Sequence, residues 1–248
     1  MVMVALGQTA AVAALAPALG LTVQQIVQAA PHADHAGLGA PRGVGAGQAG
    51  GRRPDPAFAR PTKRVGPVYP QDVAHALARR HGWHIAKDAT GWHQVVASPS
   101  PEGIVETETI HDLLTCGALV ICAGGGGVPV TADHDTGALT GADAVVDKDL
   151  TAALLAEELK ADFLLILTDV PCVYTGYGTH DPQPVLDATP DDLRRGGFPA
   201  GSMGPKTEAA ARFVERTGAL AAIGALDAAY EIVHGRSGTL VRRDLTVG

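Results

Sequence analysis

The sequence has 248 residues, of which 46% are hydrophobic and 18% are charged, so it can bury a sizeable core. Its formal net charge of -7 argues against a nucleic-acid-binding protein, which usually carries a basic surface. These values also exclude a disordered chain and indicate a globular protein.

The first 53 residues differ in character from the rest. Residues 1–20 are apolar and rich in alanine, but no lysine or arginine precedes them, so neither a secretion signal nor a membrane span is expected. Residues 31–53 are rich in Gly, Ala and Pro and have no period, which indicates a loop or a disordered segment. His32 and His35 have no further candidate ligands nearby for a metal.

Residues 54–103 indicate a small α+β subdomain. Prolines within residues 55–69 favour extended backbone and turns. Residues 71–81 have an amphipathic pattern that predicts a helix, and Gly82 would end it. Two β-prone runs around an Asp-Ala-Thr-Gly turn predict a hairpin over residues 83–97.

From residue 104 to residue 248, predicted helices and strands alternate. The continuous apolar run at residues 163–167 is typical of a strand that is buried on both faces. This alternation predicts an α/β fold with a mainly parallel sheet covered by helices. The predicted elements are helix 106–115, strand 119–123, a small excursion at 132–141, helix 149–159, strand 163–167, helix 205–216 closed by Gly218, and strand 220–223.

The three cysteines, Cys116, Cys122 and Cys172, all lie among apolar residues. Their odd number and irregular spacing favour reduced thiols in a cytoplasm, where they serve as packing residues.

Four consecutive glycines, Gly124, Gly125, Gly126 and Gly127, follow a predicted strand. Ligands of parallel α/β sheets bind beyond the carboxyl ends of the strands. Glycine allows the backbone to approach a ligand, and its N–H groups can form a nest for an anion. A flexible turn without a ligand is the alternative.

Two lysines lie at predicted helix starts, where the helix dipole disfavours a cation. Lys148 is flanked by Asp147 and Asp149, which could cap the helix or could hold the lysine for a phosphate. Lys206 follows Pro205, which suits the first helical position. With Ser202 and Gly204 before it, this second helix start could also hold a phosphate.

A third candidate position lies at the end of the buried strand, where Thr168 and Asp169 are expected at the ligand-binding edge of the sheet. Asp169 could terminate the strand in a turn, or it could contact a nucleotide or its metal.

Four segments, ICAGGGGVPV, GADAVVDKDL, LLILTDV and FPAGSMGPKTEAAARFVE, resemble in this order the carbamate kinases of the amino-acid kinase family. The segment DPAFARPTKRVGPVY, with the helix and hairpin after it, is similar to the lid subdomain of those enzymes. The likeness runs from about residue 54 to residue 241. It implies a three-layer αβα sandwich with a lid at 54–103 and a nucleotide-binding lobe at 104–248.

The resemblance also implies a reaction, in which ATP and carbamate give ADP and carbamoyl phosphate with Mg²⁺. It runs toward ATP in arginine or purine breakdown, in a cytoplasmic homodimer that binds neither nucleic acid nor membrane. Lys148 would stabilise the transferring phosphoryl group, Asp149 would orient the lysines, Lys206 would hold the nucleotide phosphates and Lys63 would close over the site. The residues expected to line the substrate and nucleotide clefts are Gly124, Gly125, Gly126, Gly127, Asp169, Tyr174, Ser202 and Met203.

The sequence departs from the family at two loops. Carbamate kinases carry a Gly-Gly-Asn-Ala loop and a His-Gly-Asn-Gly-Pro loop, but this chain has only ALGQTA at residues 5–10, and Pro171 and Cys172 follow the TDV segment. A wrong start or a frameshift would explain an irregular segment at 1–53 in place of most of the N-terminal lobe. Such a chain is expected to bind nucleotide weakly and to catalyse the reaction poorly. Another kinase of the same family, or a non-catalytic nucleotide-binding module, is the competing interpretation.

Overall fold

The computed structural model describes residues 2–5, 26–28, 44–46, 55–122, 125–133, 136–199 and 201–243. The chain divides into two compact units. The first unit comprises Met1–Arg42, Ile104–Gly127 and Lys148–Gly248, and the second comprises Gly43–Gly103 and Val128–Asp147. Residues 128–147 thus belong to the second unit, whereas the boundaries predicted from the sequence assigned them to the lobe at 104–248. The roles assigned to the lid and to the nucleotide-binding lobe stay predictions.

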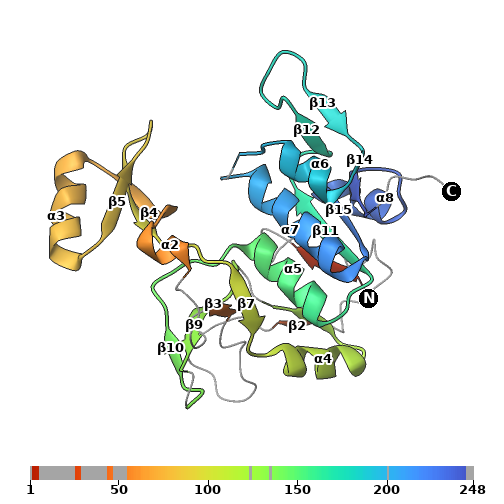
Figure 1. Ribbon diagram of the computed structural model, residues 1–248, viewed down its shortest axis with the longest axis horizontal. Coiled ribbons are helices and arrows are strands. Elements are labelled where there is room, and N and C mark those ends of the chain that lie inside the picture. Colours follow the sequence, from red (N-terminus) through yellow and green to blue (C-terminus); the bar gives the residue numbers. More distant parts are fainter. Residues whose placement is uncertain are drawn as a thin grey trace. The chain divides into compact units, whose positions relative to one another are not determined.

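The first unit is built on a five-stranded sheet whose main strands are parallel (Figure 1). In order across the sheet, its strands are β1 (Val2–Ala5), β11 (Phe163–Thr168), β15 (Leu220–Ala225), β16 (Thr239–Val241) and β14 (Asp187–Ala188). Only the β15–β16 pair is antiparallel. A separate parallel pair joins β2 (Ile26–Gln28) to β8 (Leu119–Ile121).

Strand β11 explains why helices cover both faces of this sheet. Its residues Leu164 and Ile166 pack with the helices of one face, whereas Leu165 and Leu167 pack on the other. Successive strand residues point to opposite faces, so an uninterrupted apolar strand needs a layer on each side. The first layer holds α5 (Lys148–Glu158), α6 (Pro190–Arg195) and α7 (Met203–Thr217), and the second holds α8 (Ala229–Val233) after a short 3₁₀ turn, η2 (Leu226–Ala228). The predicted three-layer αβα fold is confirmed.

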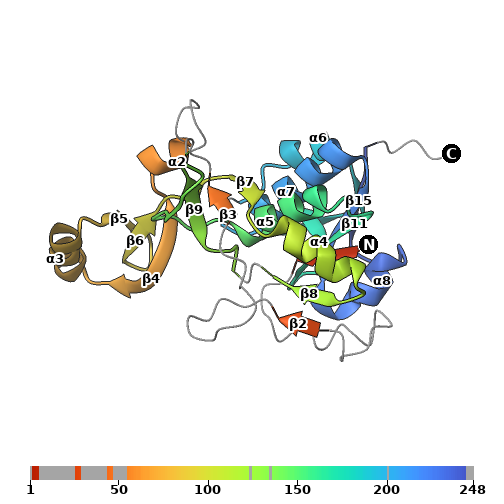
Figure 2. The same ribbon diagram turned by 90° about the horizontal axis from the view of Figure 1, so that it is seen from below.

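Two further segments complete the described part of the first unit. Helix α4 (Thr107–Thr115) lies beside β8, and its Ile110 packs with Leu155 and Leu159 (Figure 2). Strands β12 (Val173–Thr175) and β13 (Gln183–Val185) form an antiparallel hairpin after β11.

Helix α7 starts earlier than predicted. Ser202 is its N-cap residue and Met203 its first residue, so Pro205 lies third in the helix rather than first. Proline is tolerated there because the first turn leaves its N–H groups without intrahelical partners anyway. The helix does end as predicted, with Gly218 in the left-handed region at φ 75°.

The second unit contains the predicted α+β arrangement. Helix α3 (Gln71–His81) ends at left-handed Gly82, and it packs on a sheet of β4 (Lys63–Tyr69), β6 (Trp92–Val96) and β5 (His84–Lys87) (Figure 2). The predicted hairpin is the β5–β6 pair. A short helix α2 (Pro56–Ala59) precedes β4, and a second sheet has the order β10 (Leu139–Gly141), β9 (Pro129–Ala132), β3 (Val44–Ala46) and β7 (Pro101–Ile104).

The prediction that residues 1–53 are irregular is wrong at three places. Strand β1 pairs with β11, β2 pairs with β8, and β3 pairs with β9 inside the glycine-rich stretch expected to be a loop. Partner strands from later in the chain create these short strands, so local propensity alone did not reveal them. The segment ALGQTA, apart from its first residue, lies outside the described residues, as do His32 and His35.

The three cysteines differ in their exposure to solvent, although all of them have apolar neighbours in the sequence. Cys172 is buried and Cys122 partly buried, but Cys116 is exposed at the end of α4, which corrects the prediction for that residue. Burial raises the pKa of the Cys122 thiol to about 11, so it stays protonated near neutral pH.

None of the helices in the described part of the chain is long and apolar enough to cross a membrane.

Candidate active site at the ends of β11, α5 and α7

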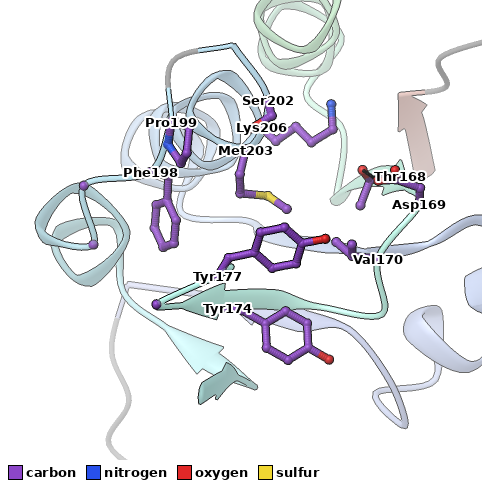
Figure 3. Close-up of a pocket in the computed structure, with 13 residues that line it drawn as sticks. Thr168, Asp169, Val170, Tyr174, Tyr177, Phe198, Pro199, Ser202, Met203 and Lys206 are labelled. Carbon is purple, nitrogen blue, oxygen red and sulfur yellow. Dashed lines mark hydrogen bonds between the residues drawn. The ribbon is translucent and has the colours of Figure 1, made fainter. Parts of the chain in front are cut away.

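A cavity of about 510 Å³ lies in the first unit, at the carboxyl end of β11. Its lining comes from the end of β11, the β12–β13 hairpin, the loop between α6 and α7, and the first turn of α7 (Figure 3). The lining residues are Thr168, Asp169, Val170, Tyr174, Gly176, Tyr177, Gly196, Gly197, Phe198, Pro199, Ser202, Met203 and Lys206. Its size suits a small organic ligand.

The cavity has an apolar side and a polar side. In Figure 3 the rings of Tyr174, Tyr177 and Phe198 lie away from the Lys206 ammonium, which extends toward the end of β11 at Thr168. Aromatic rings offer stacking surfaces to a planar group, and an ammonium attracts an anion. The arrangement therefore suits a molecule with a flat ring at one end and negative charge at the other.

Tyr174 is a hydrogen-bonding group within this lining. A hydrogen bond with Cys172, together with the negative charge that this thiol carries once it is ionised, raises the pKa of Tyr174. The phenol therefore keeps its proton near neutral pH and can act as a donor.

Asp149 joins the two lysines that lie at helix starts. Its Oδ2 accepts a hydrogen bond from Lys206 Nζ at 2.8 Å, and its Oδ1 lies 3.6 Å from Lys148 Nζ. Only 3% of Asp149 is exposed, against 12% and 31% of the side chains of Lys206 and Lys148. The buried carboxylate thus holds two cations, of which Lys148 is the more accessible to a ligand.

These lysines oppose the electrostatics of their own helices. Lys148 is the first residue of α5 and Lys206 the fourth of α7, near the positive end of each dipole. Asp149 offsets that cost, and helix packing brings the two starts together, since the apolar faces of α5 and α7 share one core. Such a concentration of positive charge is typical of sites for phosphate groups.

The glycine loop is tied to the same helix start. Thr151 Oγ1, which is fully buried in α5, donates a hydrogen bond of 2.9 Å to the Gly126 carbonyl. Gly126 and Gly127 have φ values of 126° and 87°, which side chains rarely adopt, so glycine is required at both positions. Gly125 is exposed, and Gly124 lies outside the described residues.

The structure brings most of the expected site residues together. Asp169, Tyr174, Ser202, Met203 and Lys206 line one cavity. Asp149 links that cavity to Lys148 through Lys206.

Lys63 lies in the second unit, where its Nζ is 3.2 Å from Asp147 Oδ2. Asp147 immediately precedes Lys148 in the sequence.

Sequence reasoning missed several residues of the site. Tyr177 and Phe198 supply two of the cavity's rings, and Thr151 anchors the glycine loop. Phe198 stands just before the Pro-Ala-Gly-Ser-Met-Gly-Pro-Lys stretch, which was a usable signal. Tyr177 and Thr151 carry no such signal, because only the hairpin turn and the helix packing place them.

Gly204 should be intolerant of any side chain, which a stability measurement can test. A Cβ at this position would lie 2.8 Å from the Pro199 carbonyl oxygen and 3.1 Å from that of Phe198, both in the backbone of the cavity wall. Gly204→Ala is expected to lower the free energy of unfolding in urea by about 1–3 kcal/mol, as overpacking does. Gly201→Ala is the matched control, because nothing lies within 4 Å of its added Cβ. Equal stability of the two variants would contradict the close approach.

Comparisons with known proteins show the family of this chain. A family model described as the amino acid kinase family matches residues 64–224. The chain is 47% identical over 188 residues to a carbamate kinase of Rhizobium meliloti, covering 75% of this chain and 58% of that one. It is 48% identical over 195 residues to a carbamate kinase of Thermococcus kodakarensis, covering 77% and 61%.

Solved structures give the same result. A Giardia lamblia carbamate kinase bound to AMP-PNP matches with a TM-score of 0.72 and 36% identity, over 82% of this chain and 64% of that one. The same enzyme bound to citric acid matches with a TM-score of 0.73 and 32% identity, over 93% and 68%. The chain spans about three fifths of the length of the curated relatives it matches. Its resemblance to carbamate kinases is confirmed, and the chain belongs to the amino acid kinase family.

Proposed function

We propose that this chain transfers a phosphoryl group between carbamoyl phosphate and ADP, giving ATP and carbamate, and that the physiological direction is toward ATP. An ADP β-phosphate oxygen forms the new P–O bond, and the bond between phosphorus and the carbamoyl oxygen breaks, with carbamate as the leaving group. The observation on which the proposal rests is the pair of lysines joined by buried Asp149, one of which lines a cavity with aromatic walls. The carbamate kinase relatives supply the choice of substrate.

In this proposal each residue has an electrostatic or positioning role. Phosphoryl transfer needs little covalent help from the protein, and its rate depends on alignment and charge neutralisation. Lys148, being the more exposed lysine, neutralises the transferring phosphoryl group, while Lys206 holds the nucleotide phosphates. Asp149 fixes both ammonium groups. The glycine loop at Gly125–Gly127 offers backbone N–H groups to phosphate oxygens, and the aromatic side of the cavity takes the adenine ring.

Magnesium enters this proposal as part of the nucleotide substrate. Among the described residues, no group of three or more His, Cys, Asp or Glu side chains could hold a metal ion by itself. Mg²⁺ is usually held by substrate phosphates together with one or two carboxylates. Asp169, which lines the same cavity as Lys206, is the carboxylate that we assign to the ion when Mg·ADP binds.

The proposal also includes a homodimer, a cytoplasmic location and a role in arginine or purine breakdown, which the resemblance to carbamate kinases implies.

The test is ATP formation by the purified 248-residue chain from ADP, Mg²⁺ and carbamoyl phosphate, followed with luciferase. A reaction without carbamoyl phosphate controls for ATP made from two ADP molecules. Acetyl phosphate as donor, and UMP, glutamate or aspartate as acceptors of phosphate from ATP, distinguish other members of the family. We expect ATP with carbamoyl phosphate and little product with the others. A folded, soluble chain that makes no ATP would overturn the proposal.

A further inference from the structure

The β12–β13 hairpin carries two of the rings that line the cavity, those of Tyr174 and Tyr177. Its outer part, residues 175–184, is exposed throughout, and in Figure 1 the hairpin extends beyond the helices of this unit. A two-stranded hairpin by itself is only marginally stable in water. The position of both rings therefore depends on how the root of the hairpin, where β12 starts and β13 ends, is held.

One buried hydroxyl joins the two strands at this root, where Val173 lies opposite Val185. Thr239, the first residue of β16, accepts a hydrogen bond of 2.8 Å from the Val173 N–H through its Oγ1. The same hydroxyl donates a hydrogen bond to the Val185 carbonyl. Thr239 and Val173 are both fully buried. A single side chain thus links both strands of the hairpin to the central sheet.

The backbone on either side of this hydroxyl is also fixed. The Leu240 N–H donates a hydrogen bond of 2.8 Å to the Leu186 carbonyl, so the chain that leaves the hairpin is joined to β16. On the entering side, β15 approaches so closely that a Cβ on Gly224 would lie 3.0 Å from the Pro171 carbonyl oxygen. The root is therefore held on both sides, and Tyr174 immediately follows it.

We propose that Thr239 is a positioning residue for the nucleotide, which holds the hairpin so that Tyr174 and Tyr177 meet the flat ring of ADP. The inference rests on the proposed function, since that function assigns the adenine ring to the aromatic side of the cavity. Thr239 is not among the residues that line the cavity, so it acts through the hairpin. A hydroxyl that only satisfied two backbone groups would affect stability alone, whereas a positioning residue also affects affinity for the ring.

Three variants separate these two roles. Thr239→Val keeps the branched shape and removes the hydroxyl, whereas Thr239→Ser keeps the hydroxyl. Thr217→Val is the matched control, because Thr217 Oγ1 also accepts a hydrogen bond from a backbone N–H, that of Ala219 at 3.1 Å, and donates one to the Phe213 carbonyl at 2.7 Å. Thr217 ends α7, whose opposite end lines the cavity. Each valine variant loses a comparable bridge, but only Thr239→Val releases the hairpin.

The first measurement is calorimetric binding of Mg·ADP and, separately, of inorganic pyrophosphate, which has phosphates but no ring. Thr239→Val is expected to weaken ADP binding by about tenfold, within the range that stacking of a base on an aromatic side chain supplies. Pyrophosphate binding should not change, because Lys206 lies on α7 and not on the hairpin. Thr239→Ser and Thr217→Val should bind ADP as the unsubstituted chain does. Unchanged ADP affinity in Thr239→Val, or an equal loss for both ligands, would overturn the positioning role.

Kinetics give a parallel result in the ATP-forming reaction. In Thr239→Val the KM for ADP should rise by about the same tenfold factor, while kcat and the KM for carbamoyl phosphate stay unchanged, because only contacts with the ring are weakened. A fall in kcat with an unchanged KM for ADP would contradict the inference.

Amide hydrogen exchange of the unsubstituted chain tests the inference even if Thr239→Val does not fold. The Val173 amide, which donates to Thr239 in a buried position, should exchange much more slowly than the amides of residues 176–178 at the exposed tip. Mg·ADP should slow exchange at the tip, and pyrophosphate should not. If Val173 exchanged as fast as the tip, Thr239 would not hold the hairpin, and the proposal would be wrong.

These results separate failure of this inference from failure of the proposed function. If the unsubstituted chain binds no ADP, the proposed function and the role of Thr239 toward the nucleotide are both wrong, while exchange at Val173 still decides whether the hydroxyl holds the root. If the unsubstituted chain binds ADP and Thr239→Val binds it equally well, only the inference about Thr239 is wrong.

Discussion

A Lys148→Met chain is expected to form ATP from Mg·ADP and carbamoyl phosphate about a thousandfold more slowly than the unsubstituted chain. Methionine keeps the length of the side chain and removes only its charge. A single cationic group that neutralises a transferring phosphoryl group is worth roughly 10³–10⁵ in rate. Lys148 is the more exposed of the two lysines on Asp149, and the proposed function assigns its charge to the transferring phosphoryl group. Steady-state rates measured with luciferase give the comparison.

The same substitution is expected not to weaken the fold. A lysine at the first position of α5 opposes the helix dipole, and removing it gains about 0.3–1 kcal/mol at an exposed site. Asp149 keeps Lys206 as its partner in the variant. Urea unfolding should therefore show Lys148→Met to be as stable as the unsubstituted chain, or slightly more stable.

Lys160→Met is the matched control for this prediction. Lys160 follows the opposite end of α5, where a cation complements the dipole, and it is exposed. This variant should keep full activity and lose a few tenths of a kcal/mol of stability. If Lys148→Met stayed active and lost stability instead, Lys148 would serve the helix rather than the reaction.

Local signals in the sequence predicted much of the fold. Gly82 and Gly218 both end helices in the left-handed conformation, as their positions suggested. The apolar run of β11 indicated a strand buried on both faces, and the structure confirms it. Such features depend on neighbours in the chain, which a sequence displays directly.

Features made by distant segments escaped prediction. Strand β3 exists in a glycine-rich stretch because β9 pairs with it. Cys116 lies among apolar neighbours in the sequence but is exposed, since it caps the end of α4. Tyr177 reaches the cavity only through the fold of the β12–β13 hairpin. In each case the position of the residue depends on segments that are distant in the sequence, so its immediate neighbours do not reveal it.

The candidate site shows the same division. The lysines at two helix starts were visible because they contradict the helix dipole, and residues that break a local rule often mark function. The sequence could not show that one buried carboxylate, Asp149, holds both of them. That fact depends on the packing of α5 against α7.

Asp149→Asn is accordingly expected to damage both stability and activity. Removing one member of a buried ion pair costs about 3–5 kcal/mol, because the remaining charge is left uncompensated. Both lysines retain some contact with water, so we expect a loss of about 2–3 kcal/mol, which lowers the melting temperature by roughly 4–12 °C in a chain of this size. ATP formation should fall by at least about a hundredfold, since neither ammonium is then held in place.

Asp112→Asn serves as the control, since that carboxylate lies on α4 with 86% of its side chain exposed. Its melting temperature and activity should match those of the unsubstituted chain. If Asp149→Asn behaved like this control, the contact with Lys206 would have neither a structural nor a catalytic role.

A double variant separates the two effects of Asp149. Combining Lys206→Met with Asp149→Asn in one chain removes both charged partners of the 2.8 Å contact. Replacing both members of a buried pair costs far less than removing one, so much of the lost stability should return. Activity should not return, because the charge that holds the nucleotide phosphates is then absent. Stability that rises while activity stays low would show that this pair is kept for phosphoryl transfer and that the fold alone does not need it.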